Sequence, residues 1–220
     1  LFFFAIGLKL LRSRRETVSV EPFRPVDMAP FYDALPFILT GAQRRCVDEA
    51  IADMTAGKPM NRLCQGDVGS GKTMVAAACV YFCIKNGRQA ALMAPTELLA
   101  EQHYRGLAPL LEQLGLRCAL LTGSTPAKTK RSVTAQLASG ELDFAIGTHA
   151  LITGSVAYRD LGLVVTDEQH RFGVAQRAEL AAKGDHPHIL VMSATPIPRT
   201  LALILYGDLD VSIIDQLPPG

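Results

Sequence analysis

The stretch NRLCQGDVGSGKT, residues 61–73, decides the fold. An apolar run leads directly into a glycine-rich segment that matches G-x-x-x-x-G-K-[ST], and a helical stretch follows. Glycines let the backbone curl so that its N–H groups converge on phosphate oxygens, and the amino end of a helix adds a partial positive charge. The sequence therefore predicts a strand, a phosphate-binding loop and a helix. A glycine-rich turn that fits by chance would not explain all three together.

Every residue of this loop is a candidate for binding a nucleoside triphosphate. Lys72 would reach the β- and γ-phosphates, and the hydroxyl of Thr73 would bind Mg²⁺. The predicted ATP-binding residues of the loop are Gly66, Asp67, Val68, Gly69, Ser70, Gly71, Lys72 and Thr73.

The strand–helix pattern of this unit continues along the chain. Apolar runs lie at residues 61–65, 89–94, 117–122, 143–148, 161–167 and 188–194. Helical stretches lie at residues 72–86, 98–114, 126–139, 171–183 and 198–206. The apolar runs lack strict alternation, as expected of strands covered on both faces. The pattern predicts an α/β fold with a mainly parallel sheet and helices on both faces, whose ligand sites lie at the carboxyl ends of the strands.

Two adjacent carboxylates stand at the end of the apolar run LGLVVTD: Asp167 is its last residue and Glu168 follows it. Like charges repel unless a positive charge lies near them, and Mg²⁺ together with Lys72 would supply it if this strand lies next to the phosphate-loop strand. Asp167 would hold Mg²⁺ and its waters, and Glu168 would orient and deprotonate the attacking water. A solvated acidic turn is the alternative for an isolated pair. With the loop upstream, we expect Lys72, Asp167 and Glu168 to catalyse phosphoanhydride hydrolysis.

Polar residues near these acids would couple hydrolysis to movement. Gln169 and His170 follow the acids directly, within reach of the γ-phosphate region. The hydroxyls of Ser193 and Thr195, after the run HILVM, would hydrogen-bond back toward them, so that nucleotide state moves the loops. Alternatively, the two hydroxyls only cap the following helix, and His170 is a loop histidine with satisfied hydrogen bonds.

Composition limits the other possibilities. The 220 residues carry a net charge of +1, so any binding of nucleic acid requires a local groove rather than a global basic field. Five cysteines without a CxxC pair favour small buried hydrophobic residues over a metal or redox site, and hence a reducing, cytoplasmic compartment. They are Cys46, Cys64, Cys79, Cys83 and Cys118.

The amino-terminal region predicts a connector. The apolar run at residues 1–11 is too short to span a bilayer, so we expect an amphipathic helix and no membrane partner. Four prolines in residues 16–36 oppose regular structure. The chain has no initiator Met, and we expect it to start inside a longer protein.

Six motifs in order carry a resemblance to a known family. GDVGSGKT, APTELLAEQH, LTGS, GTHALI, DEQH and SATPIPRT resemble motifs I, Ia, a TxGx-type element, Ib, II and III of superfamily 2 helicases. Together with HRFGVAQR, YGDLDVSIID and LPPG, they make residues 35–220 resemble the RecA-like, P-loop NTPase first helicase domain of the RecG family. Residues 1–34 are less similar, to the connector from an upstream wedge domain.

The resemblance implies function and partners. It implies the ATP- and Mg²⁺-dependent motor domain of a DNA helicase or double-stranded DNA translocase that remodels branched DNA and stalled forks in recombination and repair. Its partners would be DNA, read without sequence preference, and a second RecA-like domain and a wedge domain of the same parent chain. We expect little turnover from the isolated domain.

The resemblance also implies roles for further residues. In LPFILTGAQ, Gln43 would read the adenine edge and Phe37 would contact the ring; a helix-start Gln and a core Phe are the alternatives. DNA phosphates would be gripped at the strand ends, which are otherwise ordinary strand-to-helix turns. The predicted DNA-contacting residues are Pro95, Thr96, Thr122, Gly123, Ser124, Gly147, Thr148 and His149.

Some features depart from the family or stay open. Thr166 precedes the acids where the family usually has an apolar residue, and Arg199 would contact DNA, a partner domain or an acidic residue. A transcription-repair coupling factor-like translocase shares several motifs but typically reads DEEH where this chain has Gln169. A non-catalytic DNA-binding scaffold is the other alternative, and the retained Lys72, Thr73 and acid pair argue against it.

Overall fold

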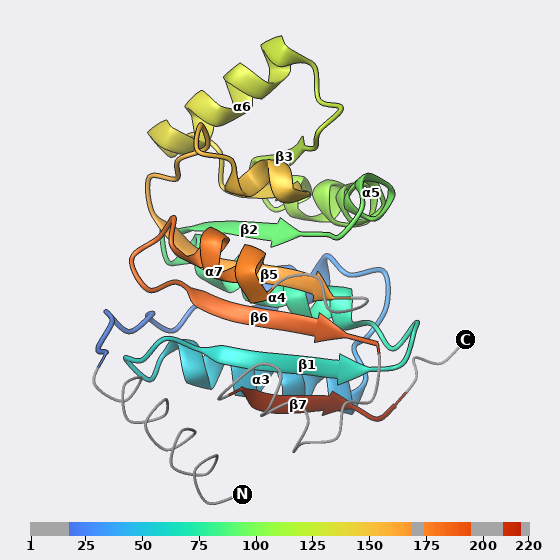
Figure 1. The fold of residues 1–220 in the computed structure, drawn as a ribbon. Coiled ribbons are helices and arrows are strands. Elements are labelled where there is room, and N and C mark those ends of the chain that lie inside the picture. Colours follow the sequence, from blue (N-terminus) through green and yellow to red (C-terminus); the bar gives the residue numbers. More distant parts are fainter. Residues whose placement is uncertain (1–17, 169–173, 195–208, 217–220) are drawn as a thin grey trace, which may run out of the picture.

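A seven-stranded parallel sheet forms the centre of the computed structural model, which describes residues 18–168, 174–194 and 209–216 (Figure 1). The strand order is β3-β4-β2-β5-β6-β1-β7, and every neighbouring pair runs parallel. The strands are β1 (Asn61–Gly66), β2 (Gln89–Met93), β3 (Cys118–Leu121), β4 (Phe144–Gly147), β5 (Leu161–Glu168), β6 (His188–Ser193) and β7 (Asp210–Ile214). The predicted α/β fold is confirmed.

The six predicted strands are confirmed, and a seventh was missed. Among the described strands, β7 lies at the sheet edge and pairs only with β1, so its run DVSII mixes exposed and buried residues. An edge strand of this kind has no continuous apolar run, which is the pattern that indicates a strand covered on both faces. One expected neighbour was wrong as well, because β6 separates the acid-bearing strand β5 from the phosphate-loop strand β1.

Helices cover both faces of the sheet, as predicted. Side chains alternate across β5, so Leu163 and Val165 join the core beneath α3, α4 and α5, whereas Val164 joins a second core beneath η1, α6 and α7. The helices are α2 (Ala29–Asp33), α3 (Gly41–Met54), α4 (Lys72–Lys85), α5 (Glu97–Gln113), α6 (Ala127–Ser139), the 3-10 helix η1 (His149–Ile152) and α7 (Val174–Ala181). The helices predicted at residues 1–11 and 198–206 lie outside the described residues.

Helix α4, which follows the phosphate loop, is buried on all sides. Nine consecutive residues, from Val75 to Cys83, are buried between the sheet, α3 and α5. Burial raises the pKa of the Cys79 thiol to about 12 and that of Cys83 further, so both thiols stay neutral and pack as small hydrophobic groups. All five cysteines are free. Within the described ranges, no helix is both long and apolar enough to cross a membrane.

The described part of the proline-rich segment packs against the main core. Phe23 and Phe31 are buried there, and the Phe31 ring lies 5.5 Å from that of Tyr81 on α4. The segment forms one short helix that was not expected, α2. Its Pro30 lies in the first turn, where a missing backbone N–H leaves no hydrogen bond unmade.

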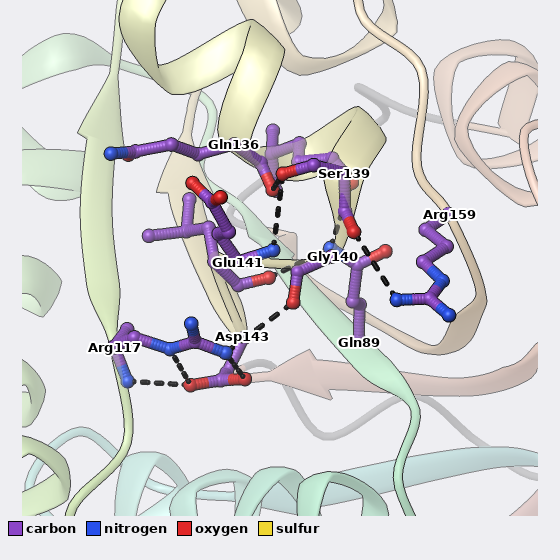
Figure 2. A network of polar contacts seen from close by, with 10 residues as sticks. Gln89, Arg117, Gln136, Ser139, Gly140, Glu141, Asp143 and Arg159 are labelled. Carbon is purple, nitrogen blue, oxygen red and sulfur yellow. Dashed lines mark hydrogen bonds and ion pairs between the residues drawn. The ribbon is translucent and has the colours of Figure 1, made fainter.

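Side chains tie together the amino edge of the sheet (Figure 2). The buried Gln89 donates to the carbonyls of Leu137 and Leu142, at 3.0 and 2.7 Å, and its own oxygen accepts from the backbone of Asp160 at 3.0 Å. Asp143 accepts two hydrogen bonds from the Arg117 guanidinium, each 2.9 Å long. These contacts connect the starts of β2, β3, β4 and β5, while their carboxyl ends lie at the opposite edge.

One amino-edge residue is a buried histidine, His188 at the start of β6. Its Nδ1 accepts the backbone N–H of Met60 at 2.9 Å, and its ring packs edge-on against Phe23, with 4.6 Å between centroids. Burial, and secondarily the charge of Arg88, lowers its pKa from 6.5 to about 4. The folded protein therefore holds His188 as neutral imidazole.

Acid should destabilise the protein through His188. The unfolded chain protonates this imidazole near pH 6.5 and the folded protein only near pH 4, so stability is complete above pH 6.5 and declines as pH falls toward 4, by up to about 3 kcal/mol. Urea unfolding of wild type and His188→Gln should show a stability difference that shrinks between pH 7.5 and 4.5. The exposed His186, changed to Asn, is the control. A difference that does not vary with pH would contradict this assignment.

Candidate functional site

The polar motifs meet at the carboxyl edge of the sheet, because all strands run parallel. The strand order divides this edge into two halves. The ends of β1, β6 and β5 form a half that carries the glycine-rich loop, the SAT sequence and the acid pair. The ends of β2, β4 and β3 form the other half, with the segments predicted to face DNA.

The loop between β1 and α4 has the backbone of an anion-binding turn. Gly69 and Gly71 adopt φ angles of 83° and 85°, which residues with a side chain rarely adopt. Gly71 is the N-cap of α4, and within the described part of the chain no side chain caps this helix. The first N–H groups of α4 are therefore available to an external acceptor, and the helix dipole favours a negative one.

Lys72 already turns its ammonium group onto the loop. Its Nζ donates to the carbonyls of Gly66 at 2.6 Å and Asp67 at 2.7 Å. Burial lowers the pKa of Lys72, and the carboxylates of Asp167 and Asp67 partly oppose that shift. Phosphate oxygens would be stronger acceptors than these neutral carbonyls, so the arrangement fits a triphosphate.

Gln43 braces the loop from below. Its side chain is 1% exposed, and its Nε2 donates to the carbonyl of Ser70 at 2.8 Å. Its Oε1 accepts the backbone N–H of Thr40, as part of a capping box that starts α3. A Cβ on Gly71 would lie 2.2 Å from Gln43 Nε2. The helix-start interpretation thus describes this structure, and an adenine contact would require Gln43 to leave these partners.

Phe37 lines a surface pocket instead of joining the core. The side chain is 47% exposed, and the pocket beside it has a volume of about 390 Å³. Tyr32 and Arg44 line the same pocket, and the Arg44 guanidinium lies 3.7 Å from the centre of the Tyr32 ring. The alternative of a core phenylalanine is therefore wrong, and a flat aromatic ligand would find stacking partners here.

Asp167 faces the same side of the sheet as α4. Its Oδ2 lies 2.7 Å from Nε2 of His103 on α5, and the two side chains are 16% and 11% exposed. Glu168 is the last residue of β5, in register with the buried Ser193 of β6. Thr166 is buried, and its hydroxyl has no hydrogen-bond partner among the residues that the structure describes. Gln169, His170, Thr195 and Arg199 lie outside the described residues.

His103 was missed as a functional candidate, although its motif, APTELLAEQH, was recognised. The helical spacing of Ala100, His103 and Leu107, three and then four residues apart, places the histidine on the buried stripe of α5. This spacing could have indicated from the sequence that His103 is buried. It does not reveal which strand end the imidazole contacts.

In the half predicted to face DNA, α5 and the loop after β3 are joined. Thr96 caps α5 by accepting the N–H of Leu99 at 3.3 Å. The carboxylate of Glu97 accepts both the N–H of Ser124 at 3.0 Å and its hydroxyl at 2.7 Å. These hydrogen bonds lower the pKa of Glu97 and keep it ionised, and the bond from the Ser124 hydroxyl has the largest effect. The TGS loop is thereby fixed against the start of α5.

The predicted DNA-contacting residues differ in exposure. Thr122 and Thr148 are buried, so their side chains shape the loops from within. Gly147 is buried where a Cβ would lie 2.0 Å from the carbonyl oxygen of Leu121, and only glycine allows this approach. Pro95 is half-buried. The exposed members are Thr96, Gly123, Ser124 and His149.

Comparisons with known proteins agree with the motifs. Residues 40–204 match the family described as DEAD/DEAH box helicase. The chain is 54% identical to the ATP-dependent DNA helicase RecG of Synechocystis sp., covering 99% of this chain and 27% of that protein. It is 51% identical to RecG of Streptococcus pneumoniae, covering 100% and 33%. The chain thus spans a third or less of the length of these relatives.

Solved structures agree as well. A structure described as RecG bound to a three-way DNA junction superposes with a TM-score of 0.87 at 44% identity, over 100% of this chain and 30% of that one. The helicase MrfA bound to DNA, at 18% identity and a TM-score of 0.66, covers 90% and 31% and shares the fold. The resemblance read from the motif order is confirmed.

The two glycines with positive φ should respond differently to alanine. Both substitutions strain the backbone, by about 1 kcal/mol. At Gly71 the new Cβ would collide with Gln43, whereas at Gly69 no atom of the described residues lies within 4 Å. We expect Gly71→Ala to lower the free energy of unfolding by about 1–3 kcal/mol more than Gly69→Ala. Urea denaturation measures the difference. Equal losses would contradict the brace between Gln43 and the loop.

Proposed function

Because the chain belongs to the DEAD/DEAH box helicase family, we propose that it is the ATP-binding motor domain of a RecG-like DNA helicase that remodels branched DNA. The observation that supports the proposal is that the phosphate loop with Lys72 and the strand end with Asp167 lie at the same, carboxyl edge of the sheet, beside the amino end of α4. A positive group, open N–H donors and a carboxylate are what a magnesium–triphosphate requires.

The residues would divide the work of hydrolysis. Lys72 would transfer its hydrogen bonds from the carbonyls of Gly66 and Asp67 to the β- and γ-phosphates. Thr73 and Asp167 would hold Mg²⁺, which when bound neutralises charge on the phosphates. Glu168 would orient and deprotonate the attacking water. The base would occupy the pocket beside Phe37, while Gln43 holds the loop in shape from below.

The other half of the edge would hold DNA. The solved RecG structure has RecG bound to a three-way DNA junction, and this chain superposes on 30% of that RecG chain. Thr96, Ser124 and His149 expose polar groups beside the ends of β2, β3 and β4. We expect contacts with phosphates and no reading of bases. The Ser124 hydroxyl also donates to Glu97, so the loop that would contact DNA is held in one conformation.

Movement along DNA would require further domains of the full-length protein. We propose that residues 35–220 form this motor domain and that residues 1–34 connect it to a wedge domain in the full-length protein. A second RecA-like domain would close over Lys72 and Glu168 when ATP binds. Gln169, His170, Ser193 and Thr195 would transmit the change in nucleotide state.

Loss of the Lys72 ammonium should weaken nucleotide binding. We expect the chain to bind Mg-ATP weakly and Lys72→Ala to reduce the affinity at least tenfold, because the phosphates lose their charged donor. Calorimetric titration of both proteins measures this. Lys85, an exposed lysine at the end of α4, gives the control Lys85→Ala. The proposal would be refuted if the folded wild-type chain does not bind ATP, or if Lys72→Ala binds ATP with the same affinity as wild type.

Glu168→Gln in the full-length protein separates the helicase from its rivals. The amide cannot accept the water's proton, so we expect ATP hydrolysis and fork-DNA unwinding to fall at least 100-fold while ATP still binds. A scaffold protein would keep its activity. A coupling factor-like translocase would fail to unwind a fork even as wild type, and would require RNA polymerase instead.

A further inference from the structure

The contact between His103 and Asp167 joins two motifs that are separate in the sequence, APTELLAEQH and DEQH. Nε2 of His103 lies 2.7 Å from Oδ2 of Asp167, and both side chains are largely buried. In the proposed function, Asp167 is a ligand of Mg²⁺. His103 lies on a different element, α5. An ionised carboxylate only accepts hydrogen bonds, so the imidazole is the donor in this pair.

Helix α5 holds His103 in a fixed place. The hydroxyl of Thr96 caps the helix, and Glu97 ties its first turn to the loop at Ser124. Ala100 and Leu107, one turn to either side of the histidine, are fully buried in the main core. The imidazole therefore reaches Asp167 from a helix that is anchored along its length.

A hydrogen bond to one carboxylate oxygen fixes the direction of the other. With Oδ2 engaged by His103, rotation of the Asp167 carboxylate breaks that bond, so Oδ1 stays oriented for a cation or its waters. Partners of this kind raise metal affinity, and their loss typically reduces affinity or activity 10- to 100-fold. The Lys72 ammonium is hydrogen-bonded to loop carbonyls, so it supplies charge to this edge and does not orient the Asp167 carboxylate.

We propose that His103 is a positioning residue, which holds Asp167 in the orientation that binds Mg²⁺ with the nucleotide. The inference rests on the proposed function, because it assumes that this edge binds Mg-ATP. It extends the magnesium site onto the helix of motif Ia, so the helix that starts at the predicted DNA-facing loops also supports the metal ligand.

The test measures magnesium dependence instead of turnover. ATP binding to the wild-type chain is titrated by calorimetry in EDTA and at increasing Mg²⁺. His103→Leu keeps apolar volume but removes the donor, whereas His103→Gln places an amide N–H close to the position of Nε2. The exposed neighbour on α5, Gln102, gives the control Gln102→Ala.

We expect His103→Leu to raise the Mg²⁺ concentration for half-maximal enhancement of ATP binding about tenfold, with His103→Gln and Gln102→Ala within about threefold of wild type. Binding in EDTA should be equal in all four proteins, which also shows that the variants are folded. In an Asp167→Asn background, His103→Leu should add no further change. Wild-type magnesium dependence in His103→Leu, or a further loss in the Asp167→Asn background, would overturn the inference.

Failure of the proposed function has a different signature. It appears as absence of ATP binding in the wild-type chain, and it removes the inference as well. Failure of the inference alone leaves wild-type Mg-ATP binding intact and His103→Leu indistinguishable from it.

Discussion

Parallel pairing of all seven strands is the constraint on which the site depends, because it brings every strand's carboxyl end to one edge. Residues far apart in sequence are thus brought to the same edge of the sheet by the strand topology. Lys72 follows β1 and Asp167 lies at the end of β5, yet the Asp167 carboxylate acts on the pKa of Lys72. The amino edge, tied by Gln89 and by Arg117 with Asp143, keeps the strands in this register. The proposed nucleotide and DNA sites lie at the opposite edge.

The phosphate loop is held in place on the side that packs against Gln43 of α3. Below it, Gln43 bonds to the Ser70 carbonyl and fills the space that a side chain at position 71 would need. Behind it, α4 is buried on every side and cannot shift without disturbing the main core. On the opposite side, the amino end of α4 has no side-chain cap from the described residues, and the Lys72 ammonium donates to two backbone carbonyls. Such a preorganised positive site needs little rearrangement to accept a triphosphate.

Much of this was predictable from local sequence, and the remainder depended on tertiary contacts. The phosphate loop and six strands have strong signals, since glycine spacing and buried apolar runs are local properties. Edge strand β7 has no such run, and the insertion of β6 between β1 and β5 is a matter of topology, which local patterns do not encode. Gln43 illustrates the same limit, because its motif indicates an adenine contact while its buried amide holds the loop. His103 could be placed on a buried helix face, but its partner could not.

Paramagnetic broadening by Mn²⁺ in place of Mg²⁺ tests the central claim most directly, since the effect falls steeply with distance. His103 touches the proposed metal ligand, whereas His188 begins β6 at the other edge of the sheet, roughly 20 Å away for a six-residue strand. With ATP bound, addition of Mn²⁺ should broaden the imidazole signals of His103 and leave those of His188 sharp. Sharp His103 signals under nucleotide saturation, or equal broadening of the two, would contradict a metal-nucleotide site at the carboxyl edge.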